Sequence, residues 1–78
     1  MEIKKEIKDN IYKLSLDLVK KIRYDISTMA ETKTLHYIMG LISYDYIMRE
    51  EVEKIRFLAN IVLSHRTELS DYILDNLK

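Results

Sequence analysis

The fold is decided by residues 3–26, which read IKKEIKDNIYKLSLDLVKKIRYDI. Aliphatic side chains recur there at spacings of three or four residues, which keeps them on one face of an α-helix. The members of this row are Ile3, Ile7, Ile11, Leu14, Leu18, Ile22 and Ile26. Because charged residues fill much of the remaining surface, the pattern predicts a long N-terminal helix over residues 2–27.

A second helix is predicted to contain residues 35–48, of which ten of the fourteen are apolar. Apolar side chains surround this segment, so we expect it to be buried on most of its sides. Gly40 offers an alternative in which the helix ends early, since glycine favours the left-handed cap position. The start is marked by Thr28-Met29-Ala30-Glu31, which fits a capping box, with Thr32 and Thr34 as competing starts.

A third helix is predicted to open with Arg49-Glu50-Glu51, because acidic residues favour the first turn of a helix. Its inner face is formed by Val52, Ile55, Leu58, Ala59 and Val62, with Phe57 and Ile61 pointing elsewhere. The apolar pattern lapses at residues 64–67 and then resumes, which predicts a short fourth helix over 67–77. One kinked helix over 50–77 is the alternative. The chain is therefore predicted to be a single all-α domain, residues 1–78, built as a three- to four-helix bundle.

Composition excludes several classes of function. The 78 residues carry 13 basic and 13 acidic side chains, one glycine and no cysteine. Without cysteine there is no disulfide, thiolate nucleophile or cysteine-ligated zinc site, and one glycine is too few for a glycine-rich phosphate loop. Zero net charge argues against strong nucleic-acid binding. No apolar run is long enough to span a membrane, and the charged N-terminus predicts no signal peptide. We expect a cytoplasmic protein.

The predicted length of the first helix suggests self-association. A helix of about 26 residues is about 39 Å long, whereas a compact chain of this size is about 30 Å across. The apolar row would then extend beyond a single globule and need cover. We therefore expect a homodimer, with a monomer whose first helix bends as the alternative.

The polar residues give no catalytic or metal-binding constellation. His36 and Ser43 are seven residues apart, about 10.5 Å along a helix, which is too far for a nucleophile and its base. His65 and Glu68 are two possible metal ligands without a third nearby. The acids after Arg49 belong to a helix start. We expect no enzymatic activity, no metal and no cofactor.

Aromatic residues give the best candidates for a binding surface. Tyrosine supplies a large ring and a hydroxyl, and it is enriched at interaction hot spots. Tyr37 and Tyr44 are seven apart and would lie nearly one above the other on the second helix. The candidate partner-binding residues are Tyr37, Tyr44, Tyr46, Met48 and Phe57. The alternative is that these rings are ordinary edges of the core.

The expected function is that of a small protein–protein interaction module. Ile and Lys supply 20 of the 78 residues, which fits AT-rich codons and a low-GC bacterium or its phage. We expect a regulator or inhibitor from a phage or mobile element that occludes a surface of a larger host protein. One alternative is a dimeric DNA-binding transcriptional regulator that uses Lys20, Lys21 and Arg23. Another is a structural subunit of an obligate complex.

Overall fold

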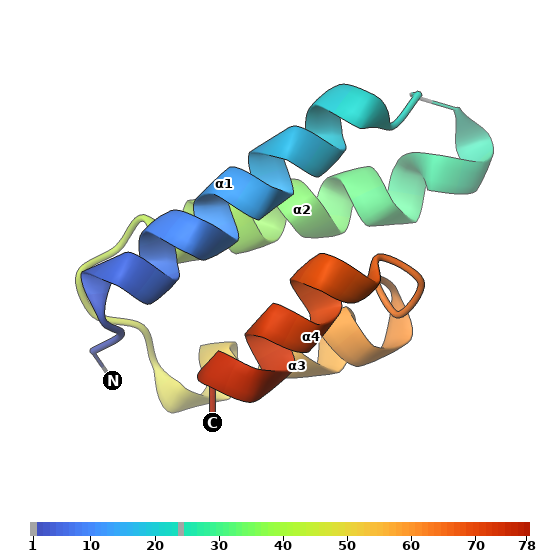
Figure 1. Ribbon diagram of the computed structural model, residues 1–78. Coiled ribbons are helices and arrows are strands. Elements are labelled where there is room, and N and C mark those ends of the chain that lie inside the picture. The colour runs from blue at the N-terminus through green and yellow to red at the C-terminus, as the bar shows by residue number, and fades with distance from the viewer. Residues whose placement is uncertain (1, 24) are drawn as a thin grey trace.

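The computed structural model describes residues 2–23 and 25–78, and all regular secondary structure in these residues is helical (Figure 1). The elements in chain order are α1 (Lys5–Lys21), a short 3-10 turn η1 (Ile26–Thr28), α2 (Met29–Ile42), α3 (Arg49–Ile61) and α4 (Thr67–Asn76). The prediction of an all-α chain with three to four helices is confirmed, with four α-helices in the described residues.

The four helices form two hairpins that pack on each other. In Figure 1, α1 and α2 run antiparallel as one hairpin, and α3 and α4 form the second hairpin beneath it. The second hairpin contacts the first through both α4 on α1 and α3 on α2. The shared core contains the most completely buried large side chains, namely Ile11, Leu35, Ile38, Ile42, Ile47, Ile55, Leu63, Leu69, Ile73 and Leu77.

The predicted helix over residues 2–27 is wrong at both ends. α1 begins at Lys5 and ends at Lys21, where Ile22 adopts an extended backbone with φ −76° and ψ 126°. The Asp25 carboxylate then accepts the Thr28 amide at 3.1 Å and the Ser27 hydroxyl at 2.6 Å, which fixes a turn. Such local side-chain bonds compete with helix continuation. Tyr24 lies outside the described residues.

This shorter helix removes the argument that α1 extends beyond the globule. Seventeen residues span about 26 Å, and the longest extent of the molecule is 34 Å. The total surface of 5322 Å² is close to the ~5,000 Å² expected for a monomer of this mass. One copy therefore covers its own core.

The predicted capping box at the start of α2 is also wrong. The box forms three residues earlier, between Asp25 and Thr28. The Thr28 hydroxyl donates to the Arg23 carbonyl at 2.5 Å, so it does not cap α2. The Glu31 carboxylate does not take part in capping and instead contacts the second hairpin.

α2 ends at Ile42, six residues before the predicted end at Met48. The Ser43 hydroxyl donates to the Gly40 carbonyl at 2.6 Å, and the Lys8 ammonium donates to the Tyr44 carbonyl at 2.5 Å. These side chains satisfy carbonyls that a continuing helix would have paired. Gly40 keeps a negative φ, so the helix does end early but without a left-handed glycine cap. The early end lets Ile47 enter the core, where it is 1% exposed.

The second hairpin matches the prediction closely. α3 starts at Arg49, buries Val52, Ile55 and Ala59, and leaves Phe57 and Ile61 exposed. The chain turns after Ile61, so the continuous kinked helix is wrong and α4 is a separate helix. Two side-chain bonds join the pair: the Ser70 hydroxyl donates to the Ala59 carbonyl at 2.9 Å, and Arg56 donates to the carbonyls of Leu74 and Leu77 near the end of α4.

Candidate partner-binding surface

Three of the five predicted binding residues lie together on the loop between α2 and α3, residues 43–48. Tyr44 and Tyr46 are each 63% exposed and Met48 is 51% exposed. Large apolar side chains seldom remain this open without a use when several share one short segment. The loop therefore presents a small apolar surface to solvent.

Contacts on both sides hold the 43–48 loop in place. Its N-terminal half is bonded to α1 through Lys8 and back to α2 through Ser43. Its C-terminal half is anchored by the buried Ile47, and the Glu51 carboxylate accepts the Met48 amide at 3.3 Å. A loop that is already ordered loses less conformational entropy on binding, so this arrangement favours recognition.

Tyr37 occupies a different environment from the loop. It lies on α2, is partly buried, and has the Lys54 ammonium of α3 4.9 Å from its ring centroid. Tyr44 lies beyond the end of α2, so the predicted stacking of Tyr37 and Tyr44 on one helix is wrong. Tyr37 is therefore part of the contact between the two hairpins.

Phe57 lies on the outer side of α3, 61% exposed, and Ile61 follows one turn later at 60%. Phe57 is eight residues from the start of α3, about 12 Å along the helix axis. The loop and the Phe57 pair are thus two separate exposed apolar spots.

The sequence interpretation missed three exposed apolar residues. Ile61 was recognised as pointing away from the core but was not taken as a candidate. Tyr12, 46% exposed, was assigned to the apolar stripe of the first helix, and Ile26, 90% exposed, to its aliphatic row. Ile61 could have been identified from the sequence, because it lies four residues after Phe57 and therefore on the same side of a helix. The exposure of Ile26 and Tyr12 could not be identified in this way, because it depends on where the first helix ends and on how α2 packs against it.

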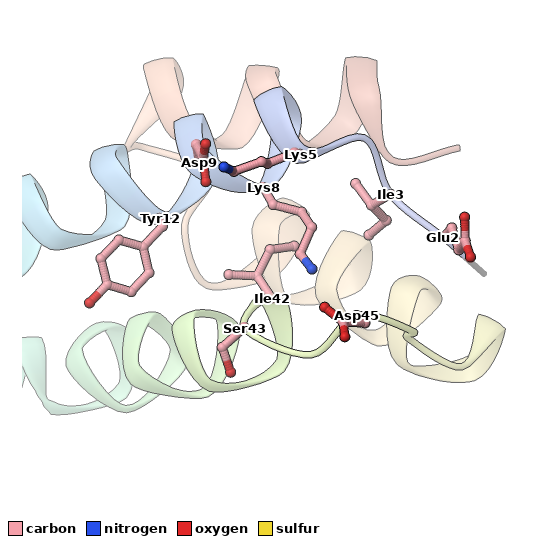
Figure 2. A pocket seen from close by; sticks show the side chains of 9 residues that line it. All are labelled: Glu2, Ile3, Lys5, Lys8, Asp9, Tyr12, Ile42, Ser43 and Asp45. Carbon is pink, nitrogen blue, oxygen red and sulfur yellow. The ribbon is translucent and has the colours of Figure 1, made fainter.

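A surface hollow of about 470 Å³ adjoins the 43–48 loop (Figure 2). Figure 2 shows Lys8 reaching from α1 toward the segment after α2, with Tyr12 and Ser43 at one end of the hollow and Ile3 and Glu2 at the other. Its charged lining residues are Glu2, Asp9 and Asp45 against Lys5 and Lys8. Three acids against two lysines leave the lining with a small net negative charge.

One histidine, His65, makes a structural contact, and the other, His36, lies on the surface. His65 Nε2 lies 2.6 Å from Glu31 Oε1, and the Arg66 guanidinium contacts Glu31 Oε2 through Nε at 2.9 Å and Nη2 at 2.7 Å. The Glu31 side chain is only 10% exposed, so these contacts join α2 to the turn between α3 and α4. His36 is exposed on α2. Within residues 2–23 and 25–78, no three His, Cys, Asp or Glu side chains are grouped as metal ligands would be.

Comparisons with protein-family models, with curated proteins and with solved structures find no match for this chain. Among the described helices, none is both long enough and apolar enough to cross a membrane.

Proposed function

We propose that this chain is a small, non-enzymatic protein-binding module whose recognition element is the 43–48 loop. The observation that carries the proposal is the contrast within that loop: Ile47 is buried, while Tyr44, Tyr46 and Met48 point outward from a backbone held by Lys8 and Glu51. Tyrosine and methionine are enriched in interface cores, where their rings and flexible side chains supply most of the contact area.

The proposed biological role is a cytoplasmic regulator or inhibitor, from a phage or mobile element, that covers a surface of a larger host protein. The small size, the balanced charge and the Ile- and Lys-rich composition support this role. A module of this kind acts by occupying a site, so it needs no catalytic group.

Capture of partners from a host lysate tests the proposal. The double substitution Tyr44→Ser with Tyr46→Ser should lose the proteins that the wild type retains, because both rings leave the contact. Ile26→Ser is the control, since it removes an apolar side chain that is 90% exposed from the connection between α1 and α2, at the opposite end of α2 from the loop. Equal capture by the double variant and the wild type would refute the assignment of the loop.

We also propose that the chain is a homodimer. The length of the first helix does not support a dimer, because α1 fits within one globule. The homodimer is supported by the distribution of side chains on the outer side of α1 and α2.

A further inference from the structure

Gly40 lies inside α2 without a structural reason for being glycine. Its backbone is not in the left-handed region, and a Cβ added there would meet nothing within 4 Å. Glycine in a helix costs up to about 1 kcal/mol relative to alanine. A bare spot on an exposed helix surface allows another backbone to approach closely.

Exposed aromatic side chains lie on α1, on α2 and just after α2. His36 lies one turn before Gly40 on α2, and Tyr44 follows the end of the helix at Ile42. Tyr12 of α1 is 46% exposed and lines the adjoining hollow together with Ser43. The outer α1–α2 face is defined here by Tyr12, His36, Gly40 and Tyr44, four exposed residues on these two helices or directly after them.

The two ends of the outer α1–α2 face carry opposite charge. At the end beside the loop, Glu2, Asp9 and Asp45 outnumber Lys5 and Lys8 by one, and the Lys8 ammonium is bonded to Tyr44. At the other end, Lys20, Arg23 and Lys33 are exposed bases and Asp25 is an exposed acid, while Lys21 and Asp17 line the hollow beside α4. When a second copy is rotated by half a turn and placed against this face, the acidic end of each copy lies opposite the basic end of the other.

We propose that the outer α1–α2 face binds a second copy of this chain about a two-fold axis near Gly40. The two α2 helices would then cross antiparallel, with Asp45 of each copy opposite the partner's Lys33. Lys33 is seven residues before Gly40, about 10 Å along the axis of α2. Asp45 lies three residues beyond the other end of that helix at Ile42, so an antiparallel crossing brings the acidic end of each copy toward the basic end of its partner. This inference rests on the proposed homodimer and assigns its interface.

The available surface is sufficient for such a dimer. A stable interface covers about 800 Å² on each partner, which is about 15% of the 5322 Å² surface of one copy. The outer side of two adjacent helices in a four-helix molecule can supply that fraction. The 43–48 loop stays partly free, because only Tyr44 of its three exposed side chains borders Gly40.

Sedimentation equilibrium tests the interface directly. The wild type should sediment as a species of twice 9.4 kDa. Gly40→Arg should weaken the dimer at least about tenfold, because it places a large charged side chain at the crossing point. Asn60→Arg, on the exposed side of α3, is the matched control and should leave the dimer unchanged. Circular dichroism of each variant verifies that the helices are retained.

A charge exchange tests the register of the two copies. Lys33→Asp and Asp45→Lys should each weaken the dimer about tenfold, and the double variant should recover most of the wild-type affinity because the pairs are reformed. A monomeric wild type at about 100 µM would overturn both the interface and the homodimer while leaving the loop proposal standing. A dimer that survives Gly40→Arg, or a double variant without recovery, would overturn the interface alone.

Discussion

The two loops that follow α2 and α3 both connect consecutive helices, but their side chains make different contacts. Each sends one aliphatic side chain into the core, Ile47 from residues 43–48 and Leu63 from residues 62–66. In the 62–66 turn two polar side chains, His65 and Arg66, contact Glu31 of α2. In the 43–48 loop the remaining large side chains point to solvent.

Under the proposed function, the 62–66 turn serves the fold and the 43–48 loop serves binding. Side chains in the 62–66 turn contribute to stability, because they pair with a nearly buried carboxylate. Tyr44, Tyr46 and Met48 contribute little burial to the monomer, so stability does not account for their apolar character. Substitutions in the two loops should therefore separate stability from partner binding.

The largest effects are expected at the two anchors. Ile47→Ala and Leu63→Ala should each lower the free energy of unfolding by about 2–4 kcal/mol, because each leaves a cavity in the core. Urea denaturation measures both. The comparison requires the two losses to be similar, and a loss below about 1 kcal/mol at Ile47 would show that the 43–48 loop is not anchored as described.

The polar contacts of the two loops should differ in strength. Glu31→Gln should cost about 1–3 kcal/mol, since it removes the charged partner of Arg66 at a site that is nearly buried. Lys8→Met removes one exposed hydrogen bond to the Tyr44 carbonyl and should cost less than about 1 kcal/mol. The same denaturation experiment checks the order, and an equal cost at both positions would contradict the distinction between the two loops.

Removal of the exposed rings should scarcely affect stability. Tyr44→Ser together with Tyr46→Ser should change the free energy of unfolding by less than about 0.5 kcal/mol at a concentration where the proposed dimer is dissociated, as is usual for surface positions. Thermal and urea unfolding of the double variant provide the test. A loss of 2 kcal/mol or more, on the order of a core substitution, would mean that the rings belong to the fold after all.

The smallest effect concerns the third connection, between α1 and α2. The hydrogen bond from Ser27, supported by the amides of Thr28 and Ser27, lowers the pKa of Asp25 below its ordinary value of 3.8. A lowered pKa means that the ionised carboxylate stabilises the turn above the ordinary pKa and that this contribution is lost as the pH falls through the folded value. An NMR titration of Asp25 should give a pKa below 3.8, rising toward it in Ser27→Ala.

Much of the fold was predictable because the second hairpin follows simple periodicity. The acids after Arg49 mark the start of α3, and the gap before Thr67 marks the start of α4. The ends of α1 and α2 were not predictable from apolar spacing, because they depend on Asp25 capping a turn and on Lys8 reaching a carbonyl 36 residues away. Contacts between distant segments override a local pattern that would otherwise continue.

The candidate site was predictable in composition but not in shape. Tyr44, Tyr46 and Met48 were identified from their residue types, yet they were expected on a helix that is buried on most sides. Tyr37 was grouped with them and instead contacts Lys54 between the hairpins. The pairing of Glu31 with Arg66 joins residues 35 positions apart, and nothing local in the sequence indicates it.

Site-specific photo-crosslinking from the 43–48 loop tests the central claim most directly. A benzophenone amino acid would replace Tyr46 in one variant and Ile26 in another, and both would be irradiated in cells of the natural host. We expect a discrete adduct with one larger protein from position 46 and none from position 26. No adduct from position 46, or the same adducts from both positions, would contradict the assignment of this loop as the binding surface.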